Sequence, residues 1–139
     1  MPAKSVLFGH PGKASDVTRT IRIIAVEYRF QPAVVNVRTG QTVRFEIFDR
    51  GTVDHEFVIG NVAEQRAHDK EMAATPTMPM HDPNEVVVAP GRSATLIWTF
   101  ARPGTLQYAC HVPGHYAAGM FGQLNVHDQV PWELRARHV

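Results

Sequence analysis

The stretch CHVPGHYAAGM, residues 110–120, carries three side chains that bind soft or borderline metal ions. Cys110, His115 and Met120 follow one another at intervals of five residues, so a thiol, an imidazole and a thioether share one loop. A thiolate and a neutral imidazole bind copper in both oxidation states, and a weak axial thioether lets the site change little when an electron arrives. The pattern therefore predicts the ligand loop of a mononuclear type 1 copper site.

A type 1 site also needs a second imidazole, and His55 is the best candidate. It follows a predicted turn at Gly51 and opens the apolar, strand-like run HEFVI, residues 55–59. We therefore predict that His55, Cys110, His115 and Met120 bind the metal ion. We further expect His55 to reach the site from the sheet that does not carry Cys110.

With these four ligands in place, the chain resembles the cupredoxins, the family of blue or green type 1 copper proteins. His55, Cys110, His115 and Met120 match, one by one, the N-terminal histidine, the cysteine, the C-terminal histidine and the methionine of that family. The likeness extends from about residue 20 to residue 127. The phrases HEFVIG (55–60) and VPGHYAAGM (112–120), with a Met- and His-containing stretch between them, are most similar to the periplasmic copper-tolerance cupredoxins. The resemblance implies a copper cofactor and a periplasmic location, with the export signal outside this sequence.

Short runs rich in β-favouring residues alternate with Gly, Pro and Asp along the chain. In one of them Val43, Phe45 and Ile47 point one way while Arg44 and Glu46 point the other, as in a half-buried strand. This spacing predicts an all-β, two-sheet antiparallel sandwich, and the resemblance implies its Greek-key form. The predicted strands span residues 21–27, 33–38, 42–48, 55–59, 85–89, 94–100, 105–110 and 121–127.

Residues 61–82 interrupt this strand pattern. Helix-forming residues there are followed by Pro76 and Pro79, which predicts one helix of two to three turns outside the sandwich. We therefore divide the chain into an N-terminal extension (1–19), one cupredoxin domain (20–127, with the insertion 61–82) and a C-terminal tail (128–139). A chain of 139 residues, 44% of them hydrophobic, can bury the core of one domain but would be crowded with two.

The insertion also offers thioethers and imidazoles, which suit monovalent copper. A second, weaker copper site would use His68, Met72, Met78, Met80 and His81. The alternative is a structural role, because methionine commonly fills irregular gaps under a loop and histidine is common in exposed segments.

Two residues beside the ligands are candidates for supporting contacts. Glu56 follows His55 and His111 follows Cys110, at places where many cupredoxins join their ligand loops through an Asn and a Ser or Thr. A Glu and His pair departs from that pattern, but a carboxylate–imidazole hydrogen bond would still tie the loops together and tune the ligands. The alternative is that both side chains reach solvent.

Charge and composition exclude several other classes of protein. A net charge of +1 and a pI near 8.0 provide no basic surface for nucleic acid, so we expect no such partner. No apolar stretch approaches the roughly 20 residues that span a bilayer, so we expect no stable membrane insertion. The lone cysteine, Cys110, has no partner for an internal disulfide and stays available as a ligand. We expect a monomer.

Copper enzymes are the competing interpretation. A binuclear copper domain needs two cysteines in its loop, and multicopper oxidases and nitrite reductases hold catalytic copper with His-x-His pairs or a histidine directly before the cysteine. This chain has one cysteine, no His-x-His pair, and Ala109 before Cys110. We therefore expect no enzyme, with a small copper-dependent oxidoreductase as the alternative because His111 follows the cysteine as in some oxidases.

The expected function is one-electron transfer, copper tolerance or both, because an electron shuttle and a copper-sequestering protein can share one primary site. In the resembling family the edge of the C-terminal histidine is exposed in an apolar patch, so the resemblance implies that a redox partner such as a cytochrome or a copper enzyme docks around His115. That patch is expected to comprise Pro113, Tyr116, Met120 and Phe121.

Overall fold

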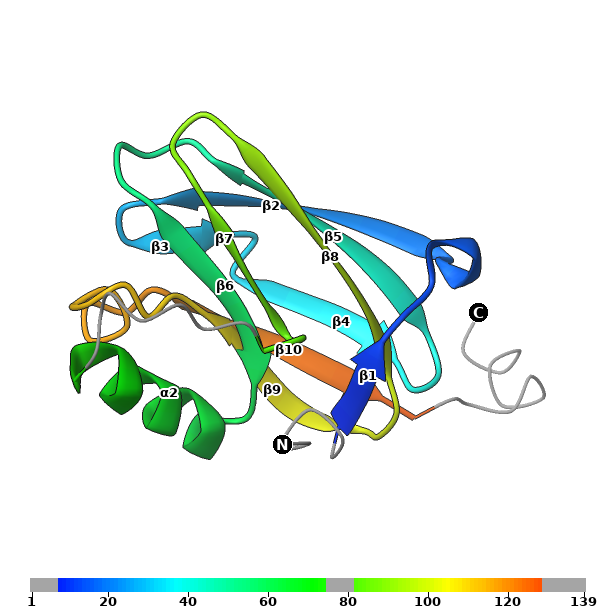
Figure 1. Cartoon of the computed structure of the whole chain (residues 1–139). Helices are drawn as coiled ribbons and strands as arrows, with labels where there is room; N and C mark the ends of the chain where they lie inside the picture. The colour runs from blue at the N-terminus through cyan, green and yellow to red at the C-terminus, as the bar shows by residue number, and fades with distance from the viewer. Residues whose placement is uncertain (1–7, 75–81, 129–139) are drawn as a thin grey trace.

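The computed structural model describes residues 8–74 and 82–128, which form two packed five-stranded sheets with one helix outside them (Figure 1). The first sheet has the strand order β1 (Gly9–Pro11), β8 (Ser93–Phe100), β5 (Thr42–Asp49), β2 (Arg19–Val26) and β3 (Arg29–Gln31). The second has the order β4 (Val34–Arg38), β10 (Phe121–His127), β9 (Gly104–Ala109), β6 (His55–Gly60) and β7 (Glu85–Val88). A 3-10 turn, η1 (Ala14–Asp16), links β1 to β2, and α2 (Val62–Ala74) follows β6. The predicted all-β sandwich with a helical insertion is confirmed.

The sheets are mixed, whereas the sequence predicted antiparallel ones. Strand β2 runs parallel to β5, and β4 runs parallel to β10, while the remaining neighbours are antiparallel. The chain crosses between the sheets after β3, β4, β5, β7 and β8. These crossings bring strands that are distant in sequence side by side. The alternation of residues within a single strand does not show whether its neighbour runs parallel or antiparallel to it.

The core lies between the sheets and follows from the alternation of apolar residues. Val43, Phe45 and Ile47 of β5 are fully buried, as the pattern predicted. The Phe45 ring contacts Phe57 of the opposite sheet at a centroid distance of 5.4 Å, and Phe57 stacks on Tyr108 at 5.5 Å. Aromatic side chains therefore join the two sheets directly below the strand ends that carry the site.

Each of the eight predicted strands is present, with ends within two residues of the prediction. Strands β1 and β3 were not predicted. Each has only three residues, and β1 reads Gly-His-Pro, so neither contains a period long enough to detect.

Helix α2 is longer than the predicted two to three turns, since 13 residues make about 3.6 turns. Its first turn is closed by a capping box: the Asn61 side chain accepts from Glu64 N–H at 2.8 Å, and Glu64 Oε1 accepts from Asn61 N–H at 2.8 Å. The Gln65 side chain donates to the carbonyls of Val58 on β6 and Gln107 on β9, which fastens the helix to two inner strands of the second sheet. Pro76 and Pro79, the predicted stop signal, lie outside the described residues. No helix among residues 8–74 and 82–128 is long and apolar enough to cross a membrane.

Candidate metal centre

Two neighbouring strands of one sheet deliver the first two predicted ligands. His55 opens β6 and Cys110 follows the last residue of β9, and these strands pair antiparallel with Val58 opposite Ala109. The expectation that His55 comes from the other sheet is therefore wrong. The reason is the Greek-key crossing, which makes β6 and β9 hydrogen-bonded neighbours although about 50 residues separate them.

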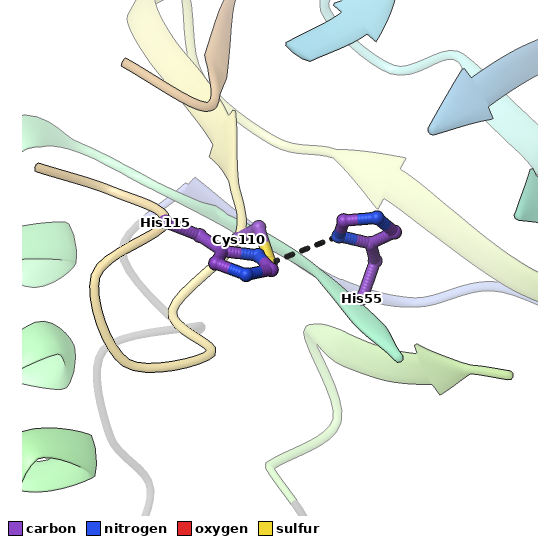
Figure 2. A group of neighbouring side chains, drawn as sticks. All are labelled: His55, Cys110 and His115. Carbon is purple, nitrogen blue, oxygen red and sulfur yellow. Dashed lines mark hydrogen bonds between the residues drawn. The ribbon is translucent and has the colours of Figure 1, made fainter. Parts of the chain in front are cut away.

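The donor atoms of His55, Cys110 and His115 converge at this strand end, as Figure 2 shows. His55 Nδ1 lies 3.8 Å from Cys110 Sγ, and His115 Nδ1 lies 3.4 Å from the same sulfur. One donor atom from each residue lies within 4.8 Å of the others. His55 and Cys110 are fully buried and His115 is 7% exposed.

The loop between Cys110 and Met120 folds back on itself and closes the group. Cys110 N–H donates to the Met120 carbonyl at 3.1 Å, and Met120 N–H donates to the His115 carbonyl at 3.1 Å. Met120 is fully buried beside Cys110 in the same apolar cluster. Gly114 and Gly119 have φ values of 91° and 97°, a left-handed conformation that glycine adopts without strain. These two glycines let the short loop fold back so that the backbones of His115 and Met120 return to that of Cys110.

Burial decides the protonation of the cysteine. Loss of solvent raises the pKa of the Cys110 thiol to about 12, and the Glu56 N–H, which donates to the sulfur at 3.3 Å, only partly opposes this. The thiol therefore keeps its proton at neutral pH until a cation replaces it. Burial also lowers the pKa of His115, which leaves that imidazole neutral and able to bind a metal. A soft sulfur and two imidazoles, all buried and within reach of one ion, fit copper.

The second nitrogen of His55 is held by a carboxylate that sequence analysis missed. Glu27 Oε2 lies 2.7 Å from His55 Nε2, and the same carboxylate accepts from Thr52 N–H and Oγ1–H. Backbone donation from Thr52 and the bond to His55 lower the pKa of Glu27. With its proton on Nε2 facing Glu27, His55 leaves the lone pair of Nδ1 free for a metal. Glu27 lies 28 residues upstream of His55, in the connection between β2 and β3 of the first sheet. No local sequence signal could therefore have identified it.

Glu56 and His111 connect the ligand segments, but not through the predicted pair of side chains. Glu56 Oε1 accepts from the backbone N–H of His111 at 3.2 Å. The His111 imidazole instead lies 2.9 Å from Asp69 Oδ1 and 2.6 Å from Gln65 Oε1, both on α2. The predicted hydrogen bond between the Glu56 carboxylate and the His111 imidazole is therefore wrong. Helix α2 packs over the loop, and its Asp69 and Gln65 side chains bind that imidazole instead. Both side chains are buried, so the solvent alternative is wrong as well.

The Met- and His-containing insertion is described only in part. His68 and Met72 lie on the buried face of α2, whereas Met78, Met80 and His81 fall outside the described residues. His68 Nε2 lies 3.4 Å from the Glu56 carboxylate. The predicted second site therefore stays a prediction, and the described partner of His68 is a carboxylate.

An exposed aromatic side chain lies beside His115, the least buried of the three candidate ligands. The Tyr28 ring meets the His115 ring edge to face at 4.9 Å, and Tyr116 packs against Phe121 at 5.3 Å. Tyr28 is 50% exposed and Phe121 is 43% exposed. Tyr28 is an addition to the predicted patch, and Met120 lies beneath the surface as a core residue.

Comparison with known proteins gives the same picture. The model of copper binding proteins of the plastocyanin/azurin family matches residues 18–127. The chain is 43% identical over 120 residues to a protein of Rubrivivax gelatinosus named copper-resistant cuproprotein CopI, covering 86% of this chain and 73% of that protein. It is 37% identical over 154 aligned positions to a protein of the same name from Pseudomonas aeruginosa, covering 90% of this chain and 85% of that protein.

Among solved structures, the chain is similar to reduced auracyanin from the photosynthetic bacterium Roseiflexus castenholzii. The TM-score is 0.69 and the sequence identity is 30%, over 83% of this chain and 99% of that chain. Fold and family comparison therefore lead to the same class of protein as the donor set.

Proposed function

This chain belongs to the plastocyanin/azurin family of copper-binding proteins, and from that premise we propose that it holds one type 1 copper ion on His55, Cys110, His115 and Met120. The single observation that carries the assignment is the convergence of a buried thiol and two imidazoles within 4.8 Å of one another. When bound, copper supplies a one-electron redox couple.

The protein's own residues prepare the site for that couple. Cys110 releases its Sγ proton on loading, and the Glu56 N–H then donates to the thiolate. Glu27 orients His55 through Nε2, and α2 fixes the start of the ligand loop through His111. Because these groups are placed before the metal arrives, little rearrangement accompanies a change of charge at the site.

We propose that the chain transfers single electrons and protects a bacterial host from copper. The copper-tolerance role is supported by two relatives, 43% and 37% identical, that are named copper-resistant cuproproteins. A periplasmic location, a monomeric state and a copper domain spanning residues 20–127 belong to the same proposal. Electrons would pass to a cytochrome or a copper enzyme at the His115 edge, where Tyr28 and Phe121 are exposed.

We propose electron transfer without catalytic turnover of a substrate. The sequence offers no His-x-His pair and no histidine before Cys110, and the imidazole of His111 is engaged by Asp69 and Gln65. A small copper oxidoreductase is the competing function. Oxidation of a phenol or turnover of nitrite by the copper-loaded chain would support that function.

A copper titration of the full chain tests the metal site. We expect one tightly bound Cu²⁺ with an intense visible band and the narrow hyperfine splitting of a type 1 centre in electron paramagnetic resonance. The matched variant Cys110→Ser should lose the band while its far-ultraviolet circular dichroism is unchanged, since a hydroxyl cannot replace the soft thiolate. A strong band in the Ser variant would defeat the ligand assignment.

Growth of a host lacking the protein tests copper tolerance. The parent gene should restore growth in excess copper, and the Cys110→Ser gene should restore less. Equal growth with both genes would separate tolerance from the type 1 site.

A further inference from the structure

A second group of metal-ligating side chains lies between β6, α2 and β7. Glu56, His68 and Glu85 each place one ligand atom within 4.8 Å of the other two. All three side chains are buried, with exposed fractions of 3%, 3% and 8%. None of them belongs to the type 1 set, although Glu56 directly follows His55.

The spacing within this group is that of a long ion pair. His68 Nε2 lies 3.4 Å from Oε1 and 3.4 Å from Oε2 of Glu56. An ordinary hydrogen bond from nitrogen to oxygen is shorter, about 2.9–3.0 Å. Two ligands of one tetrahedral ion, each bound at about 2.0–2.1 Å, lie roughly 3.3–3.4 Å apart. The observed separation therefore matches two ligands sharing an ion.

Glu85 supplies an independent sign that this position suits a cation. Neither of its buried carboxylate oxygens accepts a hydrogen bond from an N–H or O–H group of the described residues, and the carboxylate of Glu56 lies beside it. Burial, and next the nearby Glu56 carboxylate, raise the pKa of Glu85 to about 8. An unpartnered buried carboxylate facing a second carboxylate is unfavourable unless a proton or a metal ion joins them.

We propose that Glu56, His68 and Glu85 form a second metal site, which takes a divalent transition-metal ion. One imidazole and two carboxylates are ligands that suit Zn²⁺ and Cu²⁺, and Cu²⁺ binds such sites more tightly than Zn²⁺. Glu56 Oε1 already accepts from His111 N–H, so Oε2, which faces His68 Nε2 at 3.4 Å, is the oxygen that would bind the ion. Glu71 Oε1 lies 4.0 Å from the other ring nitrogen of His68, on the side away from the carboxylates that bind the ion.

This site shares His68 with the predicted Met and His site on the insertion, but the other ligands differ chemically. Oxygen and nitrogen ligands favour a divalent ion, whereas thioethers favour monovalent copper. Zinc therefore distinguishes the two, and it also leaves the type 1 band of a copper-loaded protein unchanged. The proposal does not depend on electron transfer or copper tolerance.

Zinc titration of the copper-loaded full chain tests the proposal. The type 1 site is first filled with one copper ion, as shown by its visible band, and Zn²⁺ is then added. We expect one further ion by isothermal titration calorimetry and by elemental analysis after dialysis. Glu85→Gln should weaken zinc binding at least about 10-fold and leave the type 1 band intact. The control Glu46→Gln, which alters a half-exposed carboxylate on β5, should bind zinc like the parent.

Two further variants keep the test decisive. His68→Gln should also lose the second ion, and it decides the matter if Glu85→Gln does not fold. Replacement of Met78, Met80 and His81 by alanine should retain it. The proposal is overturned if the copper-loaded parent binds no zinc, if the His68 variant binds zinc like the parent, or if only the alanine variant loses the ion.

Discussion

At the residue scale, the centre depends on groups whose protons are arranged before any metal arrives. Cys110 is a buried acid with a pKa raised to about 12, and His55 directs its proton toward Glu27. Because the Cys110 thiol is protonated, a metal ion that binds there must displace its proton. The contact between His55 and Glu27 makes one ligand sensitive to a carboxylate that never touches the metal.

Copper loading should depend on pH because the thiol must lose its proton. Below the raised pKa of Cys110 the metal-free protein is protonated at sulfur, so binding releases one proton. The apparent Cu²⁺ affinity should fall about tenfold for each unit by which pH is lowered from about 8 to 6. Competition titrations with a chelator of known affinity measure the slope. An affinity that stays constant over this range would mean that the thiolate already exists before loading.

Glu27→Gln tests the carboxylate behind His55. The amide oxygen still accepts from Nε2–H, but the negative charge that makes the imidazole a stronger donor is gone. We expect Cu²⁺ affinity to fall on the order of tenfold and the reduction potential to rise, while the visible band persists.

Protein-film voltammetry and a chelator titration provide both values for Glu27→Gln. Asp16→Asn, in the exposed turn η1, is the control for a lost carboxylate and should match the parent. A potential equal to that of the parent would show that Glu27 orients the ring without tuning it.

At the element scale, helix α2 and the ligand loop each hold one end of the segment from Cys110 to Met120. Helix α2 holds the start of the loop through His111, and the loop's own backbone bonds hold its end at Met120. The short connection after β2 contributes Tyr28 to the same surface, where its ring covers His115. A loop from each side therefore frames the edge at which electrons would enter.

Tyr28→Lys should slow electron exchange with a redox partner. Tyr28 is half exposed and touches the ring of His115, so a lysine there places a charge in the apolar contact. The spectrum should change little, because Tyr28 is not a ligand. Stopped-flow reduction by a partner cytochrome measures the rate constant.

Thr95→Lys is the matched control, since it adds the same charge at an exposed position of β8 in the first sheet. It should keep the parental rate. If both variants exchange electrons equally fast, the docking surface lies elsewhere.

At the scale of the whole molecule, the site sits at the end of a sandwich whose sheets are joined by aromatic rings. Phe45 of the first sheet meets Phe57 of the second, and Phe57 stacks on Tyr108 of β9, the strand that leads to Cys110. The predicted ligands therefore rest on the packed core, so the positions of their strands are set before a metal binds.

Phe45→Ala should destabilise the whole molecule by about 3–5 kcal/mol, the usual range for removing a fully buried aromatic side chain. Denaturant unfolding of the metal-free protein measures the loss, and at low denaturant the copper-loaded variant should keep its visible band. Thr95→Ala, on an exposed face, should change stability by less than about 0.5 kcal/mol. A loss below about 1 kcal/mol for Phe45→Ala would mean that the sheets are held together elsewhere.

The sequence by itself determined the strand pattern and predicted the donor set. Soft ligands at equal spacing predicted copper, and alternation within β5 predicted the face that Phe45 buries. These signals are local: a ligand type is a property of one residue, and a strand period is complete within a few residues. The spacing from Cys110 to Met120 is likewise contained in one loop.

Only the tertiary structure decided which distant side chains meet. The pairing of β6 with β9 placed His55 and Cys110 on one sheet, contrary to expectation. Glu27 came to His55 and Glu85 came to Glu56 through the same long-range arrangement. Strand order and crossings between sheets depend on how the whole core packs, and no short stretch of sequence contains that information.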